Sequence, residues 1–157
     1  MIGRTLSVLG IGLVLLAALH GSASGAWAAL GESVESVDAD SKALSGARVA
    51  ATVHTGYSVR EIAAASVVVK EYVSASGVVF GITWRGLIHP DLTQVLGSYA
   101  GTYQKALQQA HRGADRRRLR VRTDQVVVEQ WGHMRNLQGR AYAPALIPPG
   151  VRIDAIR

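Results

Sequence analysis

The sequence contains no cysteine. Disulfide bonds, thiolate metal sites and a lipid-attached N-terminal cysteine are therefore excluded. It also contains no low-complexity tract, and a length of 157 residues suits one domain.

Local patterns of common enzyme sites are missing as well. The segment GSYAG, residues 97–101, has its serine out of place for a Gly-x-Ser-x-Gly elbow and falls in a predicted helix. The histidines after residue 28 are too far apart to form a local pair of metal ligands; they are His54, His89, His111 and His133. We expect no metal and no cofactor. A small hydrolase or metal-dependent enzyme, with a site assembled from scattered His, Asp and Glu residues, remains the alternative.

The N-terminal segment has the three parts of a signal peptide. Arg4 supplies a positive charge, residues 6–19 are almost purely apolar, and small residues follow. Ala-Trp-Ala at 26–28 predicts cleavage after Ala28. The alternative is an uncleaved anchor, but at ~1.5 Å per residue this apolar run is short for a hydrocarbon core of about 30 Å.

We therefore expect a signal peptide over 1–28 and a single domain over 29–157, with an extended tail over 144–157 and no membrane span after cleavage. Removal of Arg4 lowers the net charge from +6 to +5. An exported protein of the periplasm or the cell exterior does not normally meet nucleic acid, so we expect none as a partner. Its positive field would attract phospholipid headgroups, lipopolysaccharide phosphates or acidic polymers.

Helix and strand signals alternate along the rest of the chain. Strand-like runs are predicted at 48–54, 57–62, 67–74, 78–85, 118–122, 125–131 and 134–142. Capping and periodicity predict a short helix over 37–45 and a long helix over 90–112. This order predicts an α+β fold with an antiparallel sheet made from two strand groups, each preceded by a helix, and with the long helix packed on the sheet.

The segment KEYVSASGVVFGITWRG, residues 70–86, predicts a β-hairpin. Ser74 suits the start of a type I turn, and Gly77 suits the left-handed position of the bulge that follows. A three-residue loop would pair Ser74 with Val78.

That register places Tyr72 opposite Phe80 and Val68 opposite Trp84. We expect Tyr72, Phe80 and Trp84 to face the long helix and to form much of the core. An exposed aromatic strip for a partner is the alternative.

Several stretches together carry a family resemblance. They are ALG at 29–31, REI at 60–62, the hairpin at 70–86, PDLTQVLGSY at 90–99, GHMR at 132–135 and GRAYAPALIPPGV at 139–151. In combination they resemble small exported proteins of Gram-negative bacteria grouped as domain of unknown function 2844. Ala75 occupies a turn position where that pattern has proline. The resemblance implies export and one compact domain, and it assigns no residue a role.

The carboxylates of the predicted strands are Glu61, Glu71 and Glu129. Glu71 lies on a strand face that is otherwise rich in valine. An ion pair with a strand neighbour, Arg60 or Arg85, is the favoured explanation. A buried and unpaired Glu71 would instead be a candidate acid.

Arginines supply the clearest candidate binding surface. Arg118, Arg120 and Arg122 alternate along a predicted strand and therefore project to one face, with Arg116 just before them. Guanidinium groups suit bidentate contact with phosphate or carboxylate. We therefore predict an anion-binding stripe at Arg116, Arg118, Arg120 and Arg122. The alternative is a solvated edge strand whose charges prevent aggregation.

A second group of aromatic and basic residues follows in the last two strands. A turn near Gly132 would gather them into a possible ligand rim made of Trp131, His133, Arg135, Arg140 and Tyr142. Ordinary cross-strand packing is the alternative. Together these features favour a non-enzymatic binding or structural module of the cell envelope that engages an anionic envelope component or a protein partner.

Overall fold

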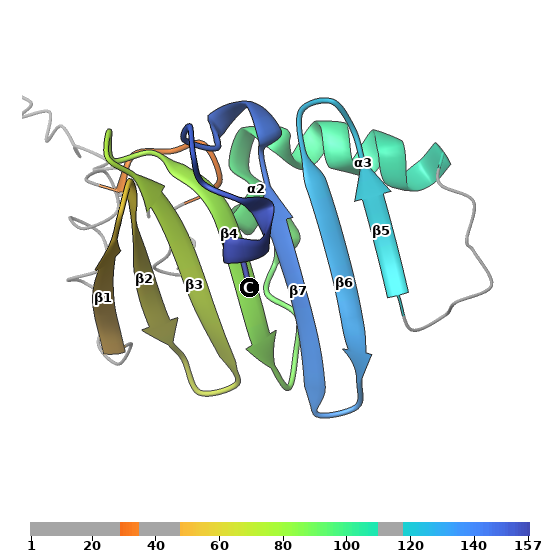
Figure 1. Cartoon of the computed structure of the whole chain (residues 1–157). Helices are drawn as coiled ribbons and strands as arrows, with labels where there is room; N and C mark the ends of the chain where they lie inside the picture. The colour runs from red at the N-terminus through yellow and green to blue at the C-terminus, as the bar shows by residue number, and fades with distance from the viewer. Residues whose placement is uncertain (1–28, 35–47, 110–117) are drawn as a thin grey trace, which may run out of the picture.

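The computed structural model describes residues 29–34, 48–109 and 118–157. In this part of the chain, seven strands form one antiparallel sheet in the order β1-β2-β3-β4-β7-β6-β5 (Figure 1). The strands are β1 (Arg48–His54), β2 (Tyr57–Ala63), β3 (Val67–Ser74), β4 (Val79–Gly86), β5 (Arg118–Arg122), β6 (Val127–His133) and β7 (Asn136–Tyr142). Two meanders, β1 to β4 and β5 to β7, join where β4 pairs with β7.

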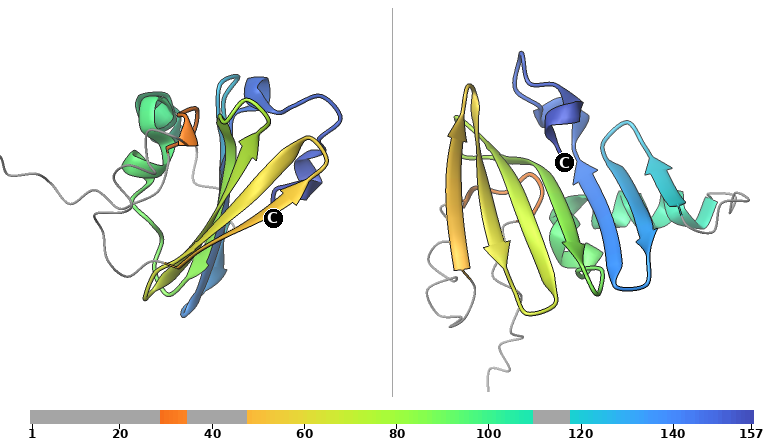
Figure 2. Two further views of the ribbon diagram at one scale, coloured as in Figure 1. Left: turned by 90° about the vertical axis from the view of Figure 1, so that its left-hand side faces the viewer. Right: turned by 60° about the horizontal axis from the view of Figure 1, so that its bottom comes forward.

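A helical segment lies between β4 and β5 in the chain and covers one face of the sheet. It consists of α2 (Leu92–Leu96), the 3-10 turn η1 (Gly97–Tyr99) and α3 (Ala100–Gln109). Asp91 caps α2, since its carboxylate accepts a hydrogen bond from the Thr93 N–H at 2.8 Å. The C-terminal segment, with η2 (Pro144–Leu146) and η3 (Ile153–Ala155), lies over the opposite face, as the left view of Figure 2 shows.

The predicted fold class is wrong. The described chain is mostly one seven-stranded antiparallel sheet, and within the described residues a helical segment precedes the β5–β7 meander but not the β1–β4 meander. The long helix predicted over 90–112 begins at Leu92 and is interrupted at Gly97, whose φ is 51°. The short helix predicted over 37–45 lies outside the described residues, as do residues 110–112.

The N-terminal segment 29–34 explains the interruption at Gly97. The Leu30 N–H donates to the Val95 carbonyl at 2.9 Å, so this segment passes directly against the end of α2. A Cβ at position 97 would lie 2.8 Å from the Ala29 Cβ. Close approach of this segment, rather than contact with the sheet, therefore requires the glycine.

The β3–β4 turn agrees with the prediction, but the register beyond it does not. The Ser74 N–H donates to the Val78 carbonyl at 2.9 Å, and Gly77 has a φ of 80°. A β-bulge at Phe80 then shifts the register, so Tyr72 pairs with Gly81 and not with Phe80. Because one residue of slip exchanges the faces of a strand, Tyr72 and Trp84 lie on opposite sides of the sheet.

The sheet consequently separates two apolar clusters. The first lies between the sheet and the helical segment and includes Val69, Ile82 and Trp84. The second lies on the opposite face, where Ile156 packs against Tyr72, Phe80, Val127 and Tyr142. The prediction that the long helix covers three aromatic residues is therefore correct for Trp84 and wrong for Tyr72 and Phe80. Burial on both faces accounts for the nearly continuous apolar run of β4.

Glu71 is fully buried on the helix-facing side of β3. Arg60, its register partner on β2, places Nη1 3.6 Å from Glu71 Oε2, which confirms the predicted ion pair with a strand neighbour. Glu71 is therefore a structural residue of the β2–β3 pair.

Candidate functional site

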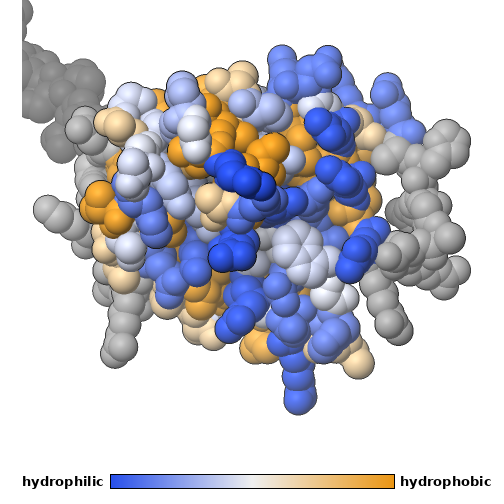
Figure 3. All heavy atoms as spheres, in the orientation of Figure 1, coloured by the Kyte–Doolittle hydropathy of each residue, from blue (hydrophilic) through white to orange (hydrophobic). Residues whose placement is uncertain are grey.

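The face of the sheet opposite the helices carries the predicted arginines. Arg118, Arg120 and Arg122 are exposed on β5, the edge strand, and their register partners on β6 are Trp131, Glu129 and Val127. Hydrophilic side chains are prominent over the part of this face that β5, β6 and β7 form (Figure 3). Arg116, the first residue of the predicted stripe, lies outside the described residues.

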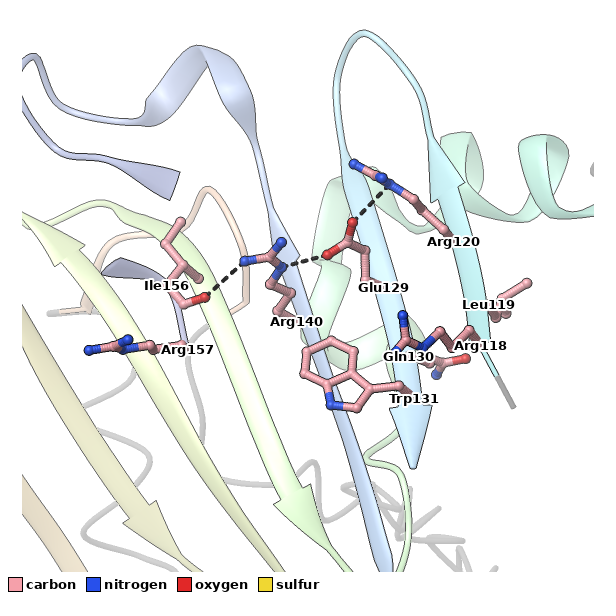
Figure 4. Close-up of a pocket in the computed structure, with 9 residues that line it drawn as sticks. All are labelled: Arg118, Leu119, Arg120, Glu129, Gln130, Trp131, Arg140, Ile156 and Arg157. Atoms are coloured by element: carbon pink, nitrogen blue, oxygen red, sulfur yellow. Dashed lines mark hydrogen bonds and ion pairs between the residues drawn. The ribbon is translucent and has the colours of Figure 1, made fainter. Parts of the chain in front are cut away.

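A depression of about 430 Å³ opens on this face between β5 and the C-terminal segment. It is lined by Arg118, Leu119, Arg120, Glu129, Gln130, Trp131, Arg140, Ile156 and Arg157 (Figure 4). Its lining therefore combines four arginine side chains, one indole and one acidic side chain.

Glu129 holds two of these arginines in place. Its Oε1 lies 2.8 Å from Arg120 Nε, and its Oε2 lies 2.6 Å from Arg140 Nε. Arg140 also donates from Nη1 to the Ile156 carbonyl at 3.3 Å. These contacts link β5, β6, β7 and the C-terminal segment. The fold therefore preorganises the guanidinium groups of Arg120 and Arg140.

Two further arginines of the depression remain available for an external anion. Neither Arg118 nor the guanidinium of Arg157 has an acidic partner among the residues that the structure describes. The partly exposed indole of Trp131 lies over β7, between the side chains of Arg118 and Arg157, as Figure 4 shows. The arrangement offers a flat apolar platform between two unpaired cations.

The predicted rim is only partly assembled. Trp131 and Arg140 both line the depression. Tyr142 is buried beneath the C-terminal segment, where the Arg140 guanidinium lies 5.8 Å from its ring centroid. His133 and Arg135 are exposed at the β6–β7 turn, at the end of the strands.

Other residues of the depression were not identified from the sequence. The sequence presents Glu129 only as one of three carboxylates in predicted strands, and it places Arg157 in an extended tail over the core without assigning it a role. Alternation along β6 does place Glu129 on the same face as Trp131. No local pattern indicates that Arg157 reaches this face, since the approach of the C-terminal segment depends on tertiary packing of Ile156.

A second depression, of about 470 Å³, lies on the same face over β1, β2 and β3. His54 and Tyr57 stack there with ring centroids 4.8 Å apart, and the lining also includes Glu61 and Lys70. Glu61 and Lys70 form an exposed ion pair at 3.6 Å. Arg157 lines both depressions.

Among the residues that the structure describes, the fold does not bring the scattered histidines or glutamates into one site. Within the described ranges, no three His, Asp or Glu side chains are placed to hold a metal ion. His89 accepts a hydrogen bond from Trp84 Nε1 at 2.9 Å, and burial lowers the pKa of its imidazole. Glu71 faces the helices, whereas Glu61 and Glu129 lie on the other face, separated by β3, β4 and β7.

Together, the fold and the site define a single-sheet protein with an apolar helix-covered face and an open face rich in arginine. Residues 26–156 match the family described as protein of unknown function (DUF2844), and the chain belongs to this family. The family resemblance seen in the sequence is thus confirmed, whereas export and a Gram-negative source stay predictions. No curated protein and no solved structure matches the chain. None of the helices described by the structure is long and apolar enough to cross a membrane.

Proposed function

We propose that this protein is a non-enzymatic binding module of the cell envelope, and that the depression beside β5 holds an anionic ligand. The observation that supports this most strongly is the composition of its lining, which holds four arginine side chains and one acidic side chain, Glu129; the arginines are Arg118, Arg120, Arg140 and Arg157. Since Glu129 neutralises at most one of the four guanidinium charges, the side chains of the lining carry a net positive charge. Guanidinium groups in a partly enclosed setting suit phosphate or carboxylate groups.

The ligand of this proposal is a sugar that carries phosphate or carboxylate groups. Trp131 presents the face of its indole, which is a surface on which the apolar side of a sugar ring can stack. Arg118 lies directly across the register from Trp131 and would pair with the charged group. Export, as predicted by the N-terminal segment, would bring the protein to envelope polymers and glycolipids of this chemistry.

Protection of an edge strand explains only part of this surface. Charges on β5 would discourage pairing with another sheet. Arg140, however, belongs to β7 inside the sheet, and Arg157 belongs to the C-terminal segment. Edge protection gives no reason for either of these residues, or for Trp131, to gather at the same depression.

The proposal is tested by titrating the protein with the phosphorylated oligosaccharide released from lipopolysaccharide, and with a neutral oligosaccharide as comparison. Trp131 is partly exposed and Trp84 is buried, so ligand binding should change the fluorescence of Trp131. We expect binding of the phosphorylated ligand that weakens as salt is added, because salt screens exposed charges. Arg118→Gln should reduce the affinity about tenfold, as expected for one charge-assisted contact.

Arg152→Gln is the matched control. Arg152 is also exposed, but it lies outside the depression and pairs with Asp154 at 3.1 Å. Equal loss of affinity in the two variants would mean that net charge alone drives binding and that the depression is not the site. Absence of binding to the phosphorylated oligosaccharide would contradict the proposed ligand class.

A further inference from the structure

A separate surface lies at the end of the sheet where β4 finishes and β6 turns into β7. Gly86 of β4 pairs with Leu137 of β7, and His133 pairs with Asn136 across the β6–β7 turn. The loop that follows β4 therefore lies beside that turn, and Figure 1 shows both at the lower end of the sheet. We call the surface made by Leu87, Ile88, Met134 and Arg135 the tip surface.

The tip surface is apolar and exposed. Met134 is 90% exposed, Leu87 56% and Ile88 53%. The other exposed large hydrophobic residues of the described chain, Val53, Leu107 and Ile153, belong to β1, α3 and η3 and do not extend this group. A cluster of exposed apolar side chains indicates an interaction site, whereas isolated ones are ordinary.

The backbone of the β6–β7 turn holds Arg135 in an unfavourable conformation. Arg135 has a φ of 66° and is the one non-glycine residue with positive φ in the described chain. Turn positions of this kind favour Gly, Asn or Asp, because a larger side chain is strained there. Such strain is retained mainly at functional sites. The sequence thus keeps an exposed Met-Arg pair where glycine would give a more stable turn.

Positive charge surrounds the apolar group. Arg85 is exposed at the end of β4, and Arg135 is exposed in the β6–β7 turn. Asp91, the first acidic residue after Ile88 in the sequence, is already used as the cap of α2. Exposed apolar side chains with arginines around them complement an anionic bilayer, into which the apolar groups insert while the guanidiniums bind headgroup phosphates.

We propose that the protein docks on an anionic lipid bilayer through the tip surface. Leu87, Ile88 and Met134 enter the interfacial region, and Arg85 and Arg135 contact the phosphates. The inference does not depend on the ligand proposed for the depression beside β5, which lies on the open face of the sheet rather than at its end.

The test uses the form of the protein that the cell produces after any signal-peptide cleavage. It measures cosedimentation of this protein with phosphatidylcholine vesicles that contain or lack phosphatidylglycerol. Mass spectrometry establishes the N-terminus of the protein used, which is the same in all variants. The protein should bind the phosphatidylglycerol vesicles in preference. Met134→Ser and the double variant Leu87→Ser/Ile88→Ser should each weaken binding about tenfold or more, as loss of inserted apolar area predicts.

Val53→Ser is the matched control, because Val53 is 84% exposed but lies in β1 near the opposite end of the sheet. Thermal unfolding separates docking from folding. Met134 is too exposed to support the core, so Met134→Ser should leave the melting temperature unchanged. Arg135→Gly should raise the melting temperature, because glycine adopts a positive φ without the strain that a larger residue has there. The same variant should nevertheless weaken vesicle binding, because it removes a guanidinium group.

Two results would overturn docking through the tip surface. One is failure of the protein to bind phosphatidylglycerol vesicles. The other is unchanged binding by the tip variants together with weaker binding by Arg118→Gln, which would show that headgroups are held in the depression and would support the proposed function alone.

Discussion

Among single residues, His89 links the stability of the core to pH. Its Nδ1 accepts a hydrogen bond from Trp84 Nε1 at 2.9 Å, which only the neutral imidazole can do at that atom. Burial lowers the pKa of His89 below its ordinary value of 6.5. The unfolded chain therefore takes up this proton at a higher pH than the folded protein does.

The first prediction is that stability falls as the pH falls below 6.5, the ordinary pKa of this side chain. Above that value His89 is neutral in both states and its contribution is complete; below it, protonation favours the unfolded chain until the lowered pKa is passed. Urea unfolding of the protein and of His89→Gln, at pH values on both sides of 6.5, measures this effect. The stability difference between them should depend on pH.

His133→Gln provides the comparison, because His133 is exposed at the β6–β7 turn. Its stability should follow that of the unaltered protein at every pH. If His89→Gln shows the same pH profile as the unaltered protein, another group is responsible for the acid sensitivity.

At the scale of elements, the β2–β3 pair depends on a buried ion pair. The Glu71 side chain is 0% exposed and that of Arg60 is 13% exposed. Removing one partner of a buried ion pair typically costs about 3–5 kcal/mol. Replacing both partners by apolar residues avoids that cost.

The second prediction is therefore strong coupling between these two positions. Glu71→Leu alone should lower the free energy of unfolding by about 3–5 kcal/mol, and the double variant Arg60→Leu/Glu71→Leu should lose less than the single variant. A double-mutant cycle with urea denaturation measures both values. Glu61→Gln, which breaks the exposed pair with Lys70, should cost only about 0–1 kcal/mol. Additive losses at Arg60 and Glu71 would refute the coupling.

The elements also show what local sequence can and cannot predict. The turn at Ser74–Gly77 and the alternation of β5 follow from residues next to one another, and both were predicted. The bulge at Phe80 was not, because its neighbour Gly81 accommodates Ile156, 75 residues further along the chain; a Cβ there would lie 3.1 Å from Ile156 Cδ1. The break at Gly97 was missed for a similar reason, since it depends on the approach of Ala29.

In the candidate site too, only the features that depend on neighbouring residues can be predicted from the sequence. Arg118, Arg120 and Arg122 share a face because of strand alternation, which a sequence displays directly. The depression itself requires β6 and β7 to pair beside β5 and the C-terminal segment to cross the sheet. Those contacts join residues that are distant in sequence, and no local sequence pattern predicts them. For this reason Arg157 was not recognised as part of the site.

For the whole molecule, the sheet separates two roles. The helix-covered face supplies the larger apolar cluster, and the open face carries the arginines and Trp131. Glu129, on the open face, affects both stability and binding. Its carboxylate stabilises the arrangement of Arg120 and Arg140, and it also reduces the positive charge available to a ligand. Stability and anion affinity should therefore respond in opposite directions to a change at this residue.

The third prediction concerns Glu129→Gln. Loss of two charge-assisted hydrogen bonds should lower the free energy of unfolding by about 1–3 kcal/mol, whereas affinity for the phosphorylated oligosaccharide should rise about three- to tenfold as one negative charge leaves the depression. Urea denaturation and fluorescence titration measure the two effects. Asp154→Asn, which removes an exposed carboxylate paired with Arg152, should change neither value appreciably. A loss of affinity in Glu129→Gln would show instead that Glu129 is needed to position Arg120 and Arg140 for the ligand. The positions of these two guanidinium groups would then matter more for affinity than the net charge of the depression.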